Sequence, residues 1–186
     1  AYEIMPSLVG SVMCIRDRCP VVDRRHRIEH CGFLTPVQLD RMVALAIQPV
    51  PQPVFIRDFG DLYVTVLGEP RSLASYPMRS WIDRGLRPAA SSDAPVSETN
   101  PYPNIHAMIT RETGSGRVLG ADQRIGLDEA LSAMTANGAF VAHQEGQRGT
   151  LADGMLADIA VHSRDLFAAS AEAILHDTVC DLTLLE

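Results

Sequence analysis

Residues 23–47, "DRRHRIEHCGFLTPVQLDRMVALAI", contain the first clear junction between two kinds of secondary structure. Thr35 can cap a helix, and Pro36 suits the first helical position because its missing N–H would have no partner there. Gln38 completes a T-x-x-Q capping box. A helix is therefore predicted over residues 35–47, with an apolar face of residues at helical spacing: Leu39, Met42, Val43 and Ala46.

The preceding "HRIEHC", residues 26–31, can be read in two ways. On a helix, residues four apart share a face; on a strand, every second residue does. Because the helix starts only at Thr35, we interpret residues 25–31 as a strand that ends in a short loop. His26, Ile28 and His30 would then share a face, with His30 at the C-terminal end of the strand.

The same alternation continues along the chain. "VALAIQPVPQPVF" (43–55) indicates a short buried strand and "SYPMRSWIDRG" (75–85) a helix closed by Gly85, with Trp81 in the core. "LRPAASSDAPV" (86–96) is another short apolar element, and "NIHAMITRE" (104–112) and "LDEALSAMTANGAFVAH" (127–143) are predicted helices. The second helix should bury Leu127, Leu131, Met134 and Ala142. Strands that alternate with helices predict an α/β fold with parallel strands.

From Gly149 onward the pattern changes to period two with turn glycines, in "GTLADGMLADIAVHS" and "DTVCDLTLLE". The last forty or so residues are therefore predicted to form a small β appendage. In parallel α/β folds, functional groups gather at the C-terminal ends of strands. His30 and Asp93 both occupy that position, so we expect them to converge on a metal site at one rim of the sheet.

Composition narrows the classes of function. The chain has 186 residues, 46% of them hydrophobic, which is typical of one globular domain or part of a larger one. A net charge of −7 with dispersed acids argues against nucleic-acid and membrane partners. The longest apolar runs fall short of the roughly 20 residues that a membrane span needs. Cys14, Cys19, Cys31 and Cys180 lack paired spacing, so we expect free thiols and a cytoplasmic, reducing location.

Five ordered segments carry a family resemblance: "HRIEHC", "QPVF", "SSDAPV", "LDEALSAMTANGA" and "GTLADGMLADIAV". Together they resemble the C-terminal part of metal-dependent amidohydrolases of family 3, most closely the subgroup of N-substituted formamide deformylase. The resemblance implies the last strands and helices of a (β/α)8 barrel, followed by a piece of a small β-sandwich. It implies hydrolysis of carbon–nitrogen bonds in amide-type small molecules, other than peptide bonds, by metal-activated water.

The resemblance also implies roles for the two rim residues. His30 matches a histidine at the end of the sixth barrel strand, either a metal ligand or a contact to the substrate carbonyl. Asp93 matches the acid at the end of the eighth strand, which binds metal and shuttles a proton. The expected cofactor of the full-length parent is a divalent metal, zinc above all, because zinc accepts imidazole and carboxylate ligands.

Several expected family features do not occur in this chain. There is no H-x-H pair from the first strand, no histidine from the fifth, and no lysine that could be carboxylated, since the sequence has no Lys. Met155 stands where the pattern "GxLxxGKxAD" has lysine. We therefore predict an N-terminally truncated enzyme that is inactive by itself, with barrel residues at 19–145 and the appendage at 146–186. Residues 1–18 are expected to be a non-native leader, although "AYE" at 1–3 also fits the family.

The site residues and the function also have less specific interpretations. His30 could be a strand-end histidine bonded to a carbonyl, and Asp93 could only start a turn. We expect Glu29 to form a buried ion pair with Arg25 or Arg27. The histidines outside the rim are interpreted as packing, surface or structural residues: His26, His106, His143, His162 and His176. The alternative function is a non-catalytic partial scaffold or association module, and the oligomeric state and the substrate stay open.

Overall fold

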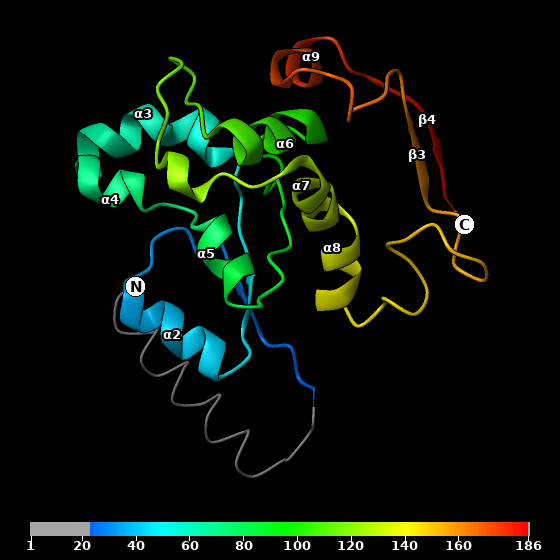
Figure 1. Cartoon of the computed structure of the whole chain (residues 1–186), viewed down its shortest axis with the longest axis horizontal. Helices are drawn as coiled ribbons and strands as arrows, with labels where there is room; N and C mark the ends of the chain where they lie inside the picture. The colour runs from blue at the N-terminus through cyan, green and yellow to red at the C-terminus, as the bar shows by residue number, and fades with distance from the viewer. Residues whose placement is uncertain (1–22, 186) are drawn as a thin grey trace.

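The computed structural model describes residues 23–185, so the predicted leader at 1–18, Cys14 and Cys19 lie outside the described residues. Strands and helices alternate at the start of the described chain, a run of helices follows, and the chain then forms two antiparallel strands with a short helix between them (Figure 1). In chain order they are β1 (Arg27–Glu29), α2 (Pro36–Ala44), β2 (Gln48–Val50), α3 (Phe55–Leu67), α4 (Glu69–Leu73), α5 (Met78–Asp83), α6 (Pro101–Thr110), η1 (Ala121–Gln123), α7 (Leu127–Met134), α8 (Ala136–Val141), β3 (Ile159–His162), α9 (Ala171–His176) and β4 (Cys180–Leu184).

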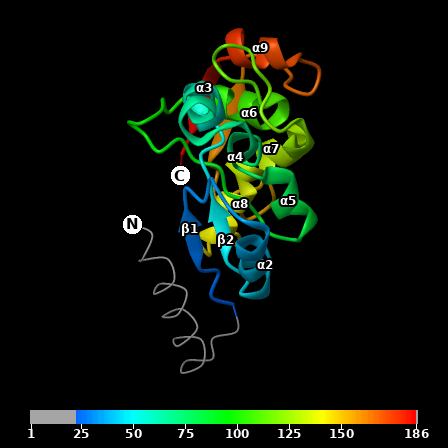
Figure 2. The same cartoon turned by 90° about the vertical axis from the view of Figure 1, so that its left-hand side faces the viewer.

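β1 and β2 form a parallel pair, with Arg27 opposite Gln48 and Glu29 opposite Val50 (Figure 2). A third extended segment, residues 87–92, runs parallel to β2 on its other side. Ala89 N donates to Pro49 O at 3.1 Å and Ser91 N donates to Pro51 O at 3.0 Å. From the first hydrogen bond to the second, donor and acceptor both move two residues toward the C-terminus, which is the pattern of a parallel ladder. The predicted parallel arrangement of the three apolar segments is confirmed.

The third segment falls short of a regular strand because prolines alternate through β2 and the residues after it. Pro49 and Pro51 have no N–H to return to residues 87–92. Side chains supply part of the missing pairing: Arg87 N donates to Gln48 Oε1 at 2.9 Å, and Gln52 Nε2 donates to Ser91 Oγ at 2.8 Å. The two glutamines on β2 and its extension therefore take over part of the ladder.

The predicted helix after Thr35 is present as α2. Thr35 and Gln38 form the full capping box, with the Thr35 side chain accepting from Gln38 N at 3.3 Å. Leu39 and Met42 are buried, as predicted. Ala46 is not on the apolar face: the helix ends at Ala44, and Ala46 is exposed with a φ of 52°. This left-handed residue stops the helix before Ile47 enters the core.

The sequence interpretation missed α3 and α4, which follow β2. α3 buries Phe55 and Ile56 and packs Phe59 and Tyr63 against the cluster formed by Val54, Phe55, Ile56, Tyr76 and Leu119. Phe55, Phe59 and Tyr63 recur four residues apart, so the helical period was present in the sequence.

The single helix predicted at 127–143 is two helices. Thr135 has φ −129° and ψ −88°, which ends α7 at Met134 and starts α8 at Ala136. The fully buried positions of α7 are the small ones, Ala130 and Ala133, because this helix packs closely against its neighbours. Leu127, Leu131 and Met134 pack against the core while staying partly exposed, so this part of the predicted apolar face is confirmed. Ala142 is exposed, and its place on that face was wrong.

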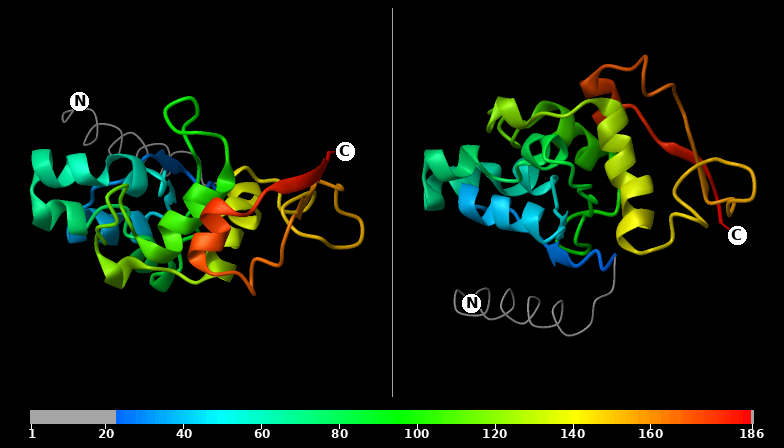
Figure 3. Two further views of the ribbon diagram at one scale, coloured as in Figure 1. Left: turned by 90° about the horizontal axis from the view of Figure 1, so that it is seen from above. Right: turned by 60° about the horizontal axis from the view of Figure 1, so that its bottom comes forward.

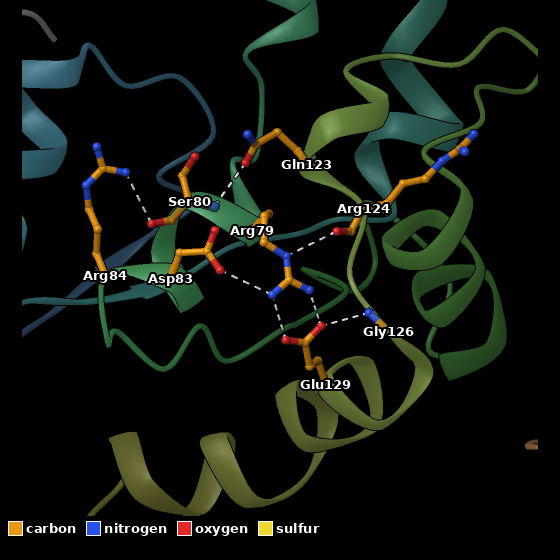
Figure 4. A network of polar contacts seen from close by, with 8 residues as sticks. All are labelled: Arg79, Ser80, Asp83, Arg84, Gln123, Arg124, Gly126 and Glu129. Carbon is orange, nitrogen blue, oxygen red and sulfur yellow. Dashed lines mark hydrogen bonds and ion pairs between the residues drawn. The ribbon is translucent and has the colours of Figure 1, made fainter.

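Trp81 lies in the main core and is fully buried on α5, as predicted, and Gly85 with a φ of 78° follows the end of that helix. A polar network joins α5 to α7 (Figure 4). Arg79 makes a two-pronged contact with Glu129, one arm at 2.8 Å, and Glu129 also accepts from Gly126 N at 2.8 Å. The Arg79 guanidinium holds the pKa of Glu129 below its usual range. Arg79 thus links α5 to α7 through Glu129, which also caps the start of α7.

The C-terminal residues form an antiparallel pair of β3 and β4, at the opposite end of the molecule from α3 and α4 (Figure 3). The short helix α9 lies between these strands in sequence and packs on α6. The predicted β character of the appendage is present, but residues 149–158 are turns and not strand. The residues from 23 to 185 form two two-stranded sheets, so a closed barrel and a β-sandwich stay expectations from the family resemblance.

Two further sequence predictions can be compared with the described part of the chain. Cys31 is a free, buried thiol and Cys180 a free, exposed one. Burial raises the pKa of Cys31 to about 12, so this thiol is unreactive at neutral pH. Between residues 23 and 185, no helix has the length and apolar character required to cross a lipid bilayer.

Candidate functional site

His30 and Asp93 lie at the C-terminal ends of the first and third parallel segments, and the structure brings them together. His30 Nδ1 and Asp93 Oδ2 are 4.0 Å apart, although the residues are 63 positions apart in sequence. The side chains are 60% and 38% exposed, respectively. The two side chains lie close together at one rim of the sheet, as predicted, and both are open to solvent; their roles in a metal site stay a prediction.

The backbone at both residues leaves the strand direction. His30 has a φ of 62°, the following Cys31 a φ of 50°, and Asp93 a φ of 56°. A non-glycine residue in this left-handed region costs roughly 1–2 kcal/mol, less for Asp. Strand alternation would have placed His30 on the face of Ile28, which packs against the core. The left-handed turn instead leaves the imidazole exposed beside Asp93.

Positive φ alone does not mark a site, because Ala46 and Arg111 also have it directly after helices. The distinctive feature of the rim is that two such residues from different segments meet. The simpler interpretation of Asp93 also holds for its backbone: Asp93 O accepts from Val96 N at 2.8 Å and so begins a turn. The turn forms through the backbone and leaves the carboxylate facing His30.

Gln52, which the sequence interpretation missed, orients the imidazole. His30 Nδ1 lies 2.9 Å from Gln52 Oε1. The buried amide of Gln52 has one possible orientation, because its nitrogen contacts Val50 O at 3.4 Å and Ser91 Oγ at 2.8 Å. A carbonyl can only accept, so the amide nitrogen faces it and the amide oxygen faces His30. Nδ1, which also lies 4.0 Å from Asp93 Oδ2, therefore carries a hydrogen, and in a neutral imidazole Nε2 has the lone pair.

Two more residues, Asn104 and Tyr76, hold the loops that carry the rim residues. Asn104 on α6 donates to Ser91 O at 2.8 Å and accepts from Val54 N at 2.9 Å, which ties the third segment to the residues after β2. Tyr76 N donates to Gly32 O at 2.7 Å, and the Tyr76 ring packs where a side chain at position 32 would lie. Gly32 thus lets the chain after His30 approach the tyrosine closely.

Other predicted residues take lesser roles. Glu29 pairs with Arg27 at 3.0 Å, as expected, but both side chains are about half exposed, so the predicted burial was wrong. The pair shares the strand face opposite Ile28. Arg25 pairs with Asp23 and Glu145. His162 contacts the hydroxyl of Tyr102 at 2.9 Å, which is a packing role, and His143 and His176 are exposed.

His106 is buried, not at the surface, and belongs to a different cluster. His106 Nε2 lies 3.9 Å from Glu112 Oε2 and 3.8 Å from Glu172 Oε1. All three ligand atoms lie within 4.8 Å of one another. Burial lowers the pKa of His106, and the two carboxylates oppose that effect. Within residues 23–185 this is the one set of three metal-ligating side chains so arranged, and the sequence interpretation missed it.

The profile of the amidohydrolase family matches residues 8–186 of the chain. The chain belongs to the amidohydrolase family. Among curated proteins, it is 31% identical over 140 residues to N-substituted formamide deformylase of Arthrobacter pascens, a match of 75% of this chain and 26% of that protein. It is 32% identical over 143 residues to Protein LONG AFTER FAR-RED 3 of Arabidopsis thaliana, covering 76% of this chain and 24% of the plant protein.

A solved metal-dependent hydrolase from Pyrococcus horikoshii shares the fold of this amidohydrolase chain. The TM-score is 0.66 at 24% identity, and the match covers 81% of this chain and 30% of the archaeal one. The chain thus spans about a quarter to a third of the length of the proteins it matches. The resemblance seen in the five ordered segments is confirmed at the level of the family.

Proposed function

We propose that this chain is the C-terminal part of a metal-dependent amidohydrolase that cleaves non-peptide carbon–nitrogen bonds in amide-type small molecules. The observation that carries the proposal is the convergence of His30 and Asp93, 4.0 Å apart, at the C-terminal rim of three parallel segments. Family membership and the names of the matched deformylase and hydrolase support the same chemistry. The first strands of the barrel and their ligands would come from residues N-terminal to this chain.

The two side chains at the rim are of types that bind a zinc-class metal. One imidazole and one carboxylate are among the ligands that zinc prefers, and catalytic zinc sites use three protein ligands. Gln52 leaves the lone pair of His30 Nε2 free, which is the form that a metal ligand needs. A neutral imidazole with this tautomer cannot donate from Nε2 to a substrate carbonyl. Of the two roles that the resemblance allows for His30, we therefore propose metal ligand.

Asp93 would carry the proton transfers. A divalent metal, when bound, supplies an activated water at neutral pH by lowering the pKa of that water to about 7. Asp93 would accept the proton as the water oxygen bonds to the amide carbon, and return it to the nitrogen as the carbon–nitrogen bond breaks. The partial exposure of the Asp93 carboxylate leaves it open to the substrate.

The test is Asp93→Asn in the full-length parent enzyme. Asparagine tolerates the left-handed conformation that position 93 adopts, so the backbone should not change. An amide cannot take up the proton, and loss of a positioned acid–base typically costs about 10²- to 10⁴-fold in rate. Amine release from a panel of N-substituted formamides and cyclic imides would measure the rate.

The matched control is Glu98→Gln, which removes an exposed carboxylate from the same loop. It should retain nearly the full rate. An Asp93→Asn enzyme that keeps more than roughly a tenth of the parent rate would contradict the assigned role.

A further inference from the structure

A second group of metal-ligating side chains lies where α6 and the residues just after it face α9. Residues two apart on a helix project about 200° apart. Asn104 faces the parallel segments, where it bonds Ser91 and Val54, so His106 faces the other way, toward α9. The cluster of His106, Glu112 and Glu172 is therefore separate from the rim of His30 and Asp93.

The histidine of this cluster is buried and its outward nitrogen has no hydrogen-bond partner. The His106 side chain is 1% exposed, and Nε2 is buried without such a bond. Its nearest polar neighbours are Glu112 Oε2 at 3.9 Å and Glu172 Oε1 at 3.8 Å, too far for hydrogen bonds. A buried polar atom without a partner costs about 1–3 kcal/mol, so its persistence here needs an explanation.

The tautomer of His106 can be assigned from Thr110. Thr110 Oγ1 donates to His106 O at 2.9 Å, which uses its only hydrogen. The same oxygen lies 3.4 Å from His106 Nδ1, so it can accept a hydrogen from Nδ1 but not donate one. Nε2 then presents a lone pair toward two carboxylate oxygens. Three electron-rich atoms face one another in this arrangement, and a cation between them would satisfy all three.

We propose that His106, Glu112 and Glu172 bind one zinc-class divalent cation that fastens α9, and with it the C-terminal strand pair, to α6. Tetrahedral zinc with bonds of about 2.0–2.2 Å places its ligand atoms about 3.4 Å apart. The two carboxylate oxygens lie 3.9 and 3.8 Å from Nε2, so each would move slightly inward to bind the ion. The Glu112 and Glu172 side chains, 33% and 68% exposed, can adjust by the remaining few tenths of an ångström.

The surroundings fit a peripheral site. His176, one turn after Glu172, contacts its second oxygen at 3.5 Å and so helps to orient the carboxylate. Burial lowers the pKa of His106, and the charge of the nearby Arg57 acts in the same direction. The imidazole favours zinc over magnesium or calcium, which prefer sites made only of oxygen ligands.

Zinc binding by the whole chain, stripped of metal with a chelator, tests the proposal. Competition with a chromophoric chelator would give affinity and stoichiometry, and cobalt(II) absorption would report ligand type. The expected result is one zinc per chain, weakened at least tenfold by Glu172→Gln and by Glu112→Gln. Glu172 is largely exposed, so its substitution should leave the fold intact. Thr110→Val should weaken binding by about 10- to 100-fold, as loss of an outer-shell partner does.

Two control variants locate the ion. Asp153→Asn removes one exposed negative charge in a distant turn and should leave zinc affinity unchanged. Asp93→Asn removes the rim carboxylate and should also leave the measured zinc affinity unchanged, because within residues 23–185 the rim offers only His30 and Asp93, whereas a zinc site uses three or four protein ligands. No zinc bound by the unsubstituted chain, equal binding by a Glu112→Gln/Glu172→Gln double variant, or loss of binding with Asp93→Asn alone would each overturn the proposal. None of these readouts depends on amide hydrolysis, so the result is independent of the proposed activity.

Discussion

Replacing Arg111 with methionine should destabilise the protein strongly, because this buried guanidinium binds three carbonyl groups on two separate stretches of backbone. Nε donates to Leu119 O at 2.7 Å, Nη1 to Tyr76 O at 2.8 Å and Nη2 to Ser75 O at 2.7 Å. Burial lowers the pKa of Arg111 to about 10, so the side chain is still charged at neutral pH. Its partners are carbonyl groups, which satisfy the charge without a carboxylate.

The size of the loss in stability follows from the carbonyl groups that the substitution would leave without a hydrogen-bond donor. Tyr76 O also accepts from Met78 N at 2.7 Å, so it keeps a donor. Ser75 O and Leu119 O would lose the charged donor of Arg111, at about 1–3 kcal/mol each. The expected loss is therefore about 2–6 kcal/mol, out of the roughly 5–15 kcal/mol typical of a domain. Methionine keeps most of the aliphatic volume, so the loss reports the hydrogen bonds.

Urea unfolding, followed by the fluorescence of the single tryptophan, would measure this loss. Trp81 is fully buried and follows directly on the Ser75–Tyr76 segment, so its emission should report the transition. The matched control is Arg117→Met, on the same loop, where an exposed arginine pairs with Glu69. Such a pair is worth about 0–1 kcal/mol. The free energy of unfolding of Arg111→Met should lie about 2–6 kcal/mol below that of wild type. If the free energies of unfolding of Arg111→Met and Arg117→Met differ by less than about 1 kcal/mol, the reasoning is refuted.

Three other outcomes are expected. Gly32→Ala should cost about 1–3 kcal/mol by thermal melting, because a Cβ would lie 2.7 Å from the packed ring of Tyr76. Gly138→Ala, in open space on α8, should instead stabilise by about 0.5–1 kcal/mol through helix propensity, and equal melting points for the two variants would contradict the packing argument. Glu129→Gln should destabilise at neutral pH, and the difference in stability from wild type should shrink as pH falls through the lowered pKa of Glu129, because protonation weakens the Arg79 contact of the wild type; a difference that does not change with pH would count against it. The isolated chain should self-associate in size-exclusion chromatography, since within residues 23–185 β1 pairs on one side only; a monodisperse monomer at all concentrations would show otherwise.

The sequence alone determined the elements whose signals are local. The capping box of Thr35 and Gln38 placed the start of α2, because each partner lies within one helical turn of the other. Apolar segments that alternate with helical ones predicted the parallel strands, and their order along the chain indicated the family. His30 and Asp93 could be chosen as rim residues because each follows a strand. These inferences need only the neighbours of each residue in the chain.

The tertiary structure decided where the side chains point and which distant residues they contact. Periodicity placed His30 on the face of Ile28, but the left-handed backbone, held by contacts from Gln52 and Tyr76, exposes it beside Asp93. His106 and Glu172 lie 66 positions apart and meet only because α9 packs on α6. Local pattern specifies which face a residue occupies on an ideal strand or helix. The departures from ideal geometry, and the contacts between distant segments, are set by packing of the whole chain.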